Sequence, residues 1–251
     1  MPIRAVVFDL FDTLVDLSLD GLPRVRVRDR EIPSSLGVLH ARLCEVTEIG
    51  LEQLADELGA LDRELRQSRY GQGRELPTRE RFEGLCRRLP GIPRQRVPEL
   101  AERLTQAHMG LLCEQVGYLE HHPGVVEALS DRAKLAVCSN FSHSQTALRV
   151  LEEAQLRWSF DAVVVSDATG FRKPRPEIFR ATFAALGVDP SETLHVGDNL
   201  RADVAGAAAV GASTAWVTRR IEDPDRALRE HEGPAPDLVV SDLAELLDRL
   251  P

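Results

Sequence analysis

Short apolar runs alternate with amphipathic segments in this chain, and this alternation restricts the possible folds more than any other feature. Runs rich in Val, Leu and Ala occupy residues 3–9, 134–138, 160–165, 193–196, 212–217 and 237–240. Their length and composition predict buried parallel strands. Apolar residues at helical spacing occupy the intervals 124–132, 142–156, 176–187, 200–210 and 242–249. Strands that alternate with helices predict an α/β fold with a doubly wound, Rossmann-like parallel sheet.

The stretch of residues 16–118 interrupts this alternation, because it has no convincing strand run and several apolar patterns of helical period. One helical face is marked by Leu51, Leu54, Leu58, Leu61 and Leu65. We therefore expect an α/β core of residues 1–15 and 119–251, with an all-helical domain at 16–118. Segment 20–35 is polar and contains prolines, which predicts a loop. Trp158 and Trp216 are expected in the core or at its edge.

Charge and composition exclude some classes of partner. The 251 residues include 31 Lys and Arg against 40 Asp and Glu, a formal charge of −9. An acidic surface disfavours nonspecific binding to nucleic acid or to anionic membranes. No apolar run approaches the roughly 20 residues that span a bilayer, and the first residues do not form a signal peptide. We expect a cytoplasmic protein whose four cysteines are reduced.

Polar residues follow the first two predicted core strands directly. Asp9, Asp12 and Thr13 follow the first strand, and Ser139 and Asn140 follow the second. Ligands of open α/β sheets bind at the carboxyl ends of strands. A carboxylate there can attack phosphorus as a nucleophile, whereas hydroxyl and amide groups suit phosphate oxygens. Each group alone is also typical of a turn or a helix cap.

Two further polar groups follow later strands. Lys173 is one of only two lysines in the chain, and it lies in a loop stiffened by Pro174. Asp198 and Asp203 follow the strand at 193–196. A compact ammonium can neutralise a transferring phosphoryl group, and paired carboxylates suit Mg²⁺, which prefers oxygen ligands. A surface lysine and an acidic helix start are the simpler interpretations of these residues.

These groups, in this order and each just after a predicted strand, resemble the motifs of the haloacid dehalogenase (HAD)-like hydrolase superfamily. The subfamily is the one whose helical cap is inserted between motifs one and two. The resemblance implies a Mg²⁺-dependent phosphatase that acts on a small phosphate monoester, with Asp9 as the nucleophile. It further implies metal ligation by Asp9, Asp198 and the backbone carbonyl of Phe11. Phosphoryl contacts and charge balance are implied for Thr13, Ser139, Asn140, Lys173 and Asp203.

One position departs from the family pattern. Phosphatases of the family usually carry a second Asp two residues after the nucleophile, where it transfers protons; this chain has Phe11 there. Asp12 would contact the substrate and replace that acid only if the turn bends at this point, because adjacent side chains of an extended strand point oppositely.

Two alternatives therefore stay open. The first is a metal-independent 2-haloacid dehalogenase, whose relatives carry an aromatic residue at the Phe11 position but lack a carboxylate like Asp198. The second is a catalytically degenerate binding protein. A phosphonoacetaldehyde hydrolase is rejected, because that family needs a cap lysine and residues 15–118 contain none.

Overall fold

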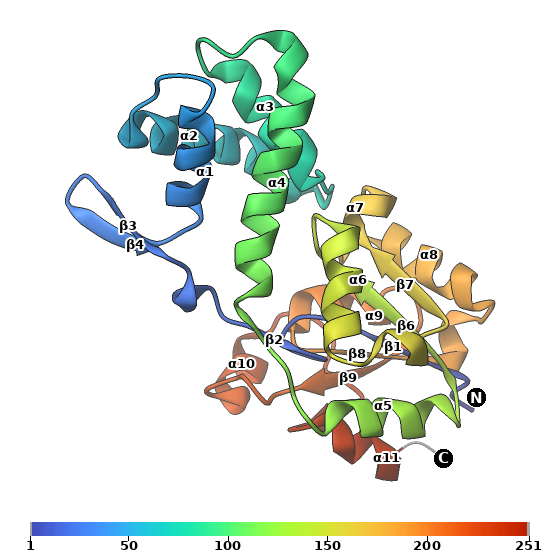
Figure 1. Ribbon diagram of the computed structural model, residues 1–251. Helices are drawn as coiled ribbons and strands as arrows, with labels where there is room; N and C mark the ends of the chain where they lie inside the picture. The colour runs from blue at the N-terminus through green and yellow to red at the C-terminus, as the bar shows by residue number, and fades with distance from the viewer. Residues whose placement is uncertain (1, 250–251) are drawn as a thin grey trace. The chain divides into compact units, whose positions relative to one another are not determined.

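The computed structural model describes residues 2–249, and the chain divides into two compact units (Figure 1). The core unit comprises Met1–Asp16 and Gly117–Pro251, and the insert unit comprises Leu17–Val116. Where the chain passes between them, β2 (Asp16–Leu17) and β5 (Val116–Gly117) form a two-stranded sheet. Among the described residues, no helix is both long and apolar enough to cross a membrane.

A six-stranded sheet forms the centre of the core unit, in the order β10-β9-β8-β1-β6-β7. Every neighbouring pair is parallel, as expected from the sequence. The strands are β1 (Ala5–Phe8), β6 (Lys134–Ser139), β7 (Ala162–Val165), β8 (Thr193–Gly197), β9 (Ser213–Val217) and β10 (Leu238–Val240). The chain moves outward from β1 through β6 and β7, then returns to the other side of β1 with β8. This reversal makes β1 the switch point of the sheet.

Helices connect the strands and cover both faces of the sheet, in the pattern predicted from the sequence (Figure 1). The helices of the core unit are α5 (His122–Ser130), α6 (Ser144–Glu153), α7 (Ser166–Thr169), α8 (Pro176–Leu186), α9 (Gly206–Ala208), α10 (Pro224–Glu230) and α11 (Leu246–Arg249). Alternate side chains of β1 face opposite layers: Ala5 and Val7 belong to the apolar cluster that contains Phe179 and Phe183 of α8. Shorter helical turns are η4 (Arg157–Ser159), η5 (Pro190–Glu192), η6 (Leu200–Ala205) and η7 (Leu243–Glu245).

The insert unit is mainly helical, as predicted, and has its own apolar core. Its helices are α1 (Leu36–Cys44), α2 (Leu51–Ser68), α3 (Thr78–Arg88) and α4 (Val97–Cys113), with the short turns η1 (Leu19–Gly21), η2 (Tyr70–Gln72) and η3 (Arg94–Arg96). The predicted leucine face of α2 packs into this core, with Leu54 and Leu61 buried and three further leucines at the edge. This unit is the helical insertion expected between the first two motifs.

The prediction of a loop at residues 20–35 was wrong, because part of this segment forms a β-hairpin. Strands β3 (Arg24–Val27) and β4 (Arg30–Pro33) pair antiparallel. Arg and Val alternate in β3, so that Val25 is buried while Arg24 and Arg26 are exposed. Arg28 supplies the positive φ of 53° that the two-residue turn requires. The period of two was present in the sequence but hidden by the high charge.

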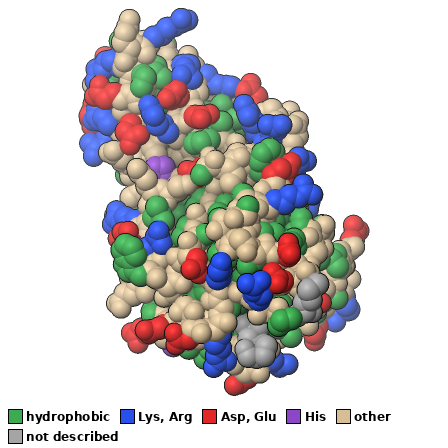
Figure 2. All heavy atoms as spheres, turned by 90° about the vertical axis from the view of Figure 1, so that its right-hand side faces the viewer, with side chains coloured by type: hydrophobic (Ala, Val, Ile, Leu, Met, Phe, Trp, Pro, Cys, Tyr) green, Lys and Arg blue, Asp and Glu red, His purple; other side chains and the backbone are tan. Residues whose placement is uncertain are grey.

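The two tryptophans differ in environment. Trp216 in β9 is 1% exposed, as predicted, but Trp158 in η4 is 87% exposed, so the expectation that it lies in the core was wrong. Its indole lies against the Arg157 guanidinium, 5.4 Å from the ring centre. All four cysteines are free thiols. Acidic and basic side chains are interspersed over the face drawn in Figure 2.

Candidate active site at the carboxyl end of strand β1

The predicted site residues of the core unit gather where β1, β6 and β8 end. Asp9 follows β1 directly, and its amide donates to the Val196 carbonyl of β8 at 2.9 Å. The Asp9 carboxylate accepts a 2.8 Å hydrogen bond from the Leu10 amide. The chain then turns back, since the amides of Leu14 and Val15 both donate to the Leu10 carbonyl. This turn presents Asp9 at the switch point of the sheet, where α/β folds bind ligands.

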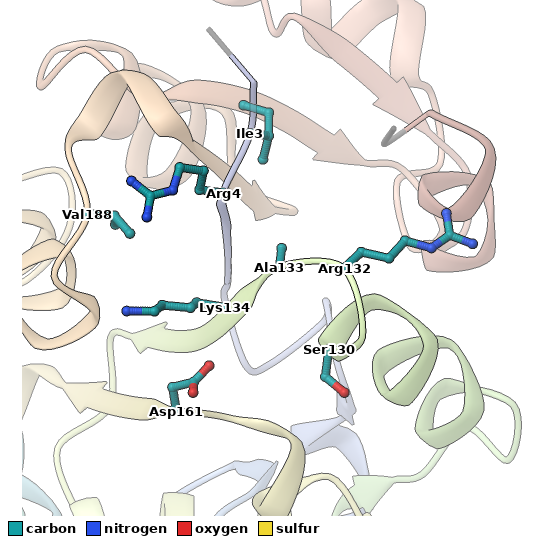
Figure 3. Close-up of a pocket in the computed structure, with 8 residues that line it drawn as sticks. All are labelled: Ile3, Arg4, Ser130, Arg132, Ala133, Lys134, Asp161 and Val188. Carbon is teal, nitrogen blue, oxygen red and sulfur yellow. The ribbon is translucent and has the colours of Figure 1, made fainter.

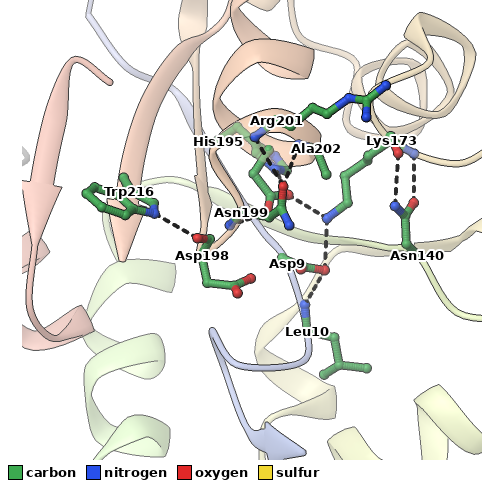
Figure 4. A network of polar contacts seen from close by, with 11 residues as sticks. Asp9, Leu10, Asn140, Lys173, His195, Asp198, Asn199, Arg201, Ala202 and Trp216 are labelled. Atoms are coloured by element: carbon green, nitrogen blue, oxygen red, sulfur yellow. Dashed lines mark hydrogen bonds and ion pairs between the residues drawn. The ribbon is translucent and has the colours of Figure 1, made fainter. Parts of the chain in front are cut away.

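Lys173 joins two carboxylates of this group (Figure 4). Its ammonium lies 2.8 Å from Asp9 Oδ1 and 2.7 Å from Asp203 Oδ1, and its side chain is 1% exposed. Burial alone would lower the pKa of Lys173, but the two neighbouring carboxylates raise it, so the ammonium stays charged. The sequence predicted that Lys173 would be presented from a loop stiffened by Pro174.

Asp203 is buried and has three hydrogen-bond donors around it. Besides Lys173, it accepts from His195 Nε2 at 2.9 Å and from the Asn199 amide at 3.1 Å. Burial raises the pKa of Asp203, but Lys173 and His195 lower it more strongly, and the carboxylate stays ionised. These hydrogen bonds fix the Asp203 carboxylate and the Lys173 ammonium relative to each other.

His195 is a residue that sequence reasoning missed. It lies in β8, is 1% exposed, and packs edge-on against the Phe179 ring at 5.2 Å. Burial lowers its pKa despite the nearby Asp203, which favours a neutral imidazole that donates from Nε2. The available signal was a histidine inside a buried apolar strand, where a polar ring needs a partner.

The junction between β8 and η6 brings Asp203 back toward Lys173. Asn199 caps the turn, because its side-chain oxygen accepts from the amides of Arg201 and Ala202. The turn is a π-helix, with the Val204 amide donating to the Asn199 carbonyl five residues earlier, in place of the predicted regular helix at 200–210. Gly197 is required here, since an added Cβ would lie 2.3 Å from Asp203 Cγ.

Asp198 completes the acidic group. Its backbone carbonyl accepts from Trp216 Nε1 at 2.7 Å, which fixes the residue at the end of β8. Ligand atoms of Asp9, Asp198 and Asp203 all lie within 4.8 Å of one another. Burial and the neighbouring Asp9 raise the pKa of Asp198 to about 7, and burial raises that of Asp9 to about 6 despite Lys173. Asp9 and Asp198 do not readily ionise at the same time, because they are buried and their negative charges repel each other. A hard divalent cation would offset this repulsion, so the pair suits such an ion.

Two predicted phosphate-binding hydroxyls lie buried near this group. Thr13 is fully buried and Ser139, the last residue of β6, is 1% exposed. The hydroxyl oxygens of both lack a hydrogen-bond partner among residues 2–249. Buried hydroxyls without a partner are unfavourable, and a bound oxyanion would satisfy them.

Asn140 has a different arrangement from the one expected for a substrate contact. Its side-chain oxygen accepts from the Lys173 amide at 2.7 Å, and its nitrogen donates to the Lys173 carbonyl at 3.0 Å. Both ends of the amide are thus used to hold the backbone of the lysine loop. One N–H of the Asn140 amide is left for another acceptor.

Phe11 and Asp12 point to different neighbours. The Phe11 ring packs on Phe141 with centroids 4.8 Å apart. Asp12 has a positive φ of 61°, so the backbone does bend here, and its carboxylate lies 3.0 Å from Arg220 Nε. The negative charge of Asp12 contributes to the raised pKa of Asp198.

A separate hollow lies at the opposite end of the strands (Figure 3). It has a volume of about 370 Å³, and Arg4 and Lys134, at the amino ends of β1 and β6, line it. These two basic side chains already have partners in the protein: Arg4 pairs with Glu192 at 3.0 Å, and Lys134 donates to the Leu186 carbonyl at 2.8 Å. None of the predicted site residues lines this hollow.

One family of known proteins matches most of the chain. The haloacid dehalogenase-like hydrolase family matches residues 3–211, so the protein belongs to this family of hydrolases. The match includes both the first strand and the residues that follow β8.

Among curated proteins, several phosphatases are similar to this chain. The glyceraldehyde 3-phosphate phosphatase of Methanopyrus kandleri is 30% identical over 98% of this chain and 96% of its own length. The phosphoserine phosphatase of Thermus thermophilus is 34% identical over 59% of this chain, and the match spans only 57% of that protein.

Solved structures share the fold over nearly the full length. The 2-haloacid dehalogenase of Pseudomonas syringae pv. Tomato superposes with a TM-score of 0.68 at 21% identity, covering 98% of this chain and 97% of that one. The putative HAD-hydrolase YfnB of Bacillus subtilis, bound to magnesium, has a TM-score of 0.60 at 20% identity, covering 100% and 99%. At this level of identity the similarity shows the fold alone.

Proposed function

We propose that the protein is a Mg²⁺-dependent phosphatase that acts on a small phosphate monoester through an aspartyl-phosphate on Asp9. The observation that carries the proposal is the position of Asp9 at the switch point, 2.8 Å from a buried ammonium and beside Asp198. The names of the curated relatives above support the same reaction class.

Each residue of the candidate site has a separate role in phosphoryl transfer. An Asp9 oxygen attacks phosphorus, the bond from phosphorus to the ester oxygen breaks, and the ester oxygen leaves as an alkoxide that takes its proton from solvent. Water then attacks the aspartyl-phosphate, which releases inorganic phosphate and restores Asp9. Lys173 balances charge on the phosphoryl oxygens, while the hydroxyls of Thr13 and Ser139 donate to them. Asn140 and Asp203 hold Lys173 in place, and Asn140 also offers its remaining N–H to the substrate.

The metal site is assigned to Asp9, Asp198 and the Phe11 carbonyl. These oxygen donors fit Mg²⁺, which usually takes one or two protein carboxylates. The cation would neutralise charge that develops on the transferred group. It would also stabilise the ionised forms of Asp9 and Asp198, whose pKa values are otherwise raised.

A dehalogenase that needs no metal is the second candidate, favoured by one observation. Phe11 occupies the position where a phosphatase of the family would carry its acidic residue, and its ring packs on Phe141. Asp198 weighs against this candidate, because a second buried carboxylate beside Asp9 would repel the anionic substrate unless a cation is bound.

The test is release of nitrophenolate from p-nitrophenyl phosphate, with Mg²⁺ or with EDTA. This leaving group needs no proton, so the assay does not depend on the acid that Phe11 replaces. We expect turnover that EDTA removes and that Asp9→Asn abolishes. Halide release from a 2-haloacid in EDTA, without phosphatase turnover, would establish the second candidate instead. Mg²⁺ binding without turnover on any ester would indicate the degenerate binding protein.

A further inference from the structure

A second cluster of possible metal ligands lies in the core unit, outside the group around Asp9. It consists of His121 and His122, at the start of α5, and Asp242, which precedes η7. One ligand atom from each residue lies within 4.8 Å of the other two. His121 Nε2 is 3.0 Å from both carboxylate oxygens of Asp242, and His122 Nε2 is 3.8 Å from Oδ2.

The hydrogen bonds of His122 decide its tautomer. Its Nδ1 lies 2.8 Å from the Leu14 carbonyl, which can only accept, so Nδ1 carries the proton. Burial lowers the pKa of His122, which leaves the ring neutral and Nε2 with a free lone pair. The side chain is 1% exposed, and Nε2 lacks a hydrogen-bond partner among residues 2–249. A buried lone pair that faces a carboxylate is unfavourable, unless a cation lies between them.

We propose that His121, His122 and Asp242 bind a zinc ion, with Nε2 of both histidines and one carboxylate oxygen as ligands. Zinc bonds of about 2.0–2.1 Å in a tetrahedron place ligand atoms roughly 3.3 Å apart. The observed separations of 3.0 and 3.8 Å bracket this value. His121 is 51% exposed, so solvent reaches the cluster and can supply the fourth ligand.

The surroundings of the cluster match those of zinc sites. Histidines that bind zinc usually donate their second N–H to a carbonyl or carboxylate, as His122 does to Leu14. Asp242 is oriented by the Ala244 amide at 2.9 Å. Two imidazoles favour zinc over magnesium, whereas the all-oxygen donors at Asp9 and Asp198 favour magnesium. The two sites therefore select different ions.

Zinc at this position would act on the first motif through Leu14. The Leu14 carbonyl belongs to the turn that follows Asp9 and Thr13, and His122 is its side-chain donor. Fixing the imidazole fixes this turn, so bound zinc is expected to raise the melting temperature of the whole core unit. The site is a structural one, with no role in attack on the ester.

The experiment is zinc titration of the full chain by calorimetry and thermal unfolding, after dialysis against a chelator and in excess Mg²⁺ to fill the Asp9 site. His121→Ala removes an exposed ligand without opening the core, and Asp242→Asn keeps a helix-capping side chain while removing the charge. His231→Ala is the matched control, a histidine of the core unit outside the cluster. Cobalt substitution adds an optical readout, because tetrahedral Co²⁺ absorbs visible light strongly and octahedral Co²⁺ does not.

We expect one zinc ion per chain, with affinity at least about tenfold weaker in His121→Ala and in Asp242→Asn. The rise in melting temperature should vanish in both variants and persist in His231→Ala. The absence of zinc binding to the wild type would overturn the proposal. Equal binding by wild type and His121→Ala would also overturn it, since the ion would then lie elsewhere.

Discussion

Lys173 is the residue on which the buried charges of the candidate site depend. Its ammonium neutralises the negative charges of Asp9 and Asp203. Without the ammonium, the two carboxylates would repel each other, and each would lose one hydrogen-bond donor. Removal of one partner from a buried ion pair costs about 3–5 kcal/mol. Lys173→Met should therefore lower the free energy of unfolding by about 3 kcal/mol and abolish phosphatase turnover.

Lys134, the only other lysine of the chain, is the matched control. Its ammonium donates a hydrogen bond to the Leu186 carbonyl, and Lys134→Met should cost about 1 kcal/mol or less. Urea denaturation of both variants measures the difference. Equal losses would show that Lys173 carries no special electrostatic role.

Phe11 leads to a prediction about the leaving group. An acid two residues after the nucleophile contributes about 10²–10⁴-fold when the alcohol must be protonated. Phe11→Asp should therefore raise the rate with an alkyl phosphate relative to p-nitrophenyl phosphate, by at least about tenfold. Phe11→Leu, which also gives up the ring contact with Phe141, separates loss of packing from gain of the acid. An unchanged ratio in Phe11→Asp would mean that Asp12 or solvent already supplies the proton.

At the scale of elements, the sequence predicted the six strands of the core and the helices α5, α6 and α8, because each has a clear apolar period. It missed α10, and it predicted one regular helix at 200–210 where the chain forms the π-helix η6 and the short α9. It also predicted which strand ends carry Asp9, Ser139 and Asp198, since parallel strands place those ends at one edge. It could not predict that Asn140 binds the backbone of Lys173, because that contact joins residues 33 positions apart. The β3–β4 hairpin was missed because charged residues masked its alternation.

The junction of β8 and η6 gives a prediction about close packing. A methyl group at position 197 would lie 2.3 Å from Asp203 Cγ, and overpacking of this kind costs about 1–3 kcal/mol. Gly197→Ala should destabilise the protein by that amount and reduce turnover, because Asp203 would shift away from Lys173. Gly124→Ala in α5 meets nothing within 4 Å and should be neutral or stabilising by about 1 kcal/mol at most. Urea unfolding and the phosphatase assay measure both variants, and equal behaviour would contradict the assigned contact.

The adjacent ends of β1 and β8 give a prediction about pH. Burial raises the pKa of Asp9 to about 6 and that of Asp198 to about 7, so the folded, metal-free site holds protons that the unfolded chain releases. These two groups therefore contribute stability to the metal-free protein that is fully present below about pH 4, near the ordinary value of 3.8, and is lost progressively as pH rises from there to the folded values of about 6 and 7. Mg²⁺ must displace the same protons, so its affinity should rise over that interval and level off above it.

Calorimetric titration of Mg²⁺ between acidic and mildly alkaline pH measures this dependence. Asp198→Asn removes the group with the higher pKa, so the remaining dependence should move to lower pH, toward the value of Asp9. An affinity that does not change with pH would show that neither carboxylate binds the ion.

At the scale of the whole molecule, we expect that the insert unit can be removed while the core unit keeps its fold and its candidate site. Its two ends meet, because the Ser18 amide donates to the Gln115 carbonyl at 3.2 Å, and a short linker can replace everything between them. Each unit has its own apolar cluster, so the core unit should fold without the insert. Replacement of Leu17–Val116 by a short Gly/Ser linker should leave a protein that unfolds cooperatively in urea and binds Mg²⁺.

The same excised core tests which unit selects the substrate. The groups proposed to transfer the phosphoryl all lie in the core unit, so the insert unit is the candidate for substrate choice, where pocket contacts are worth about 10–200-fold in discrimination. We expect the excised core to hydrolyse p-nitrophenyl phosphate and to treat a panel of metabolite phosphates within about tenfold of one another. The full chain should discriminate among them more strongly. If the excised core kept the full preference, specificity would belong to residues of the core unit, and Arg220 beside Asp12 would be the first to vary.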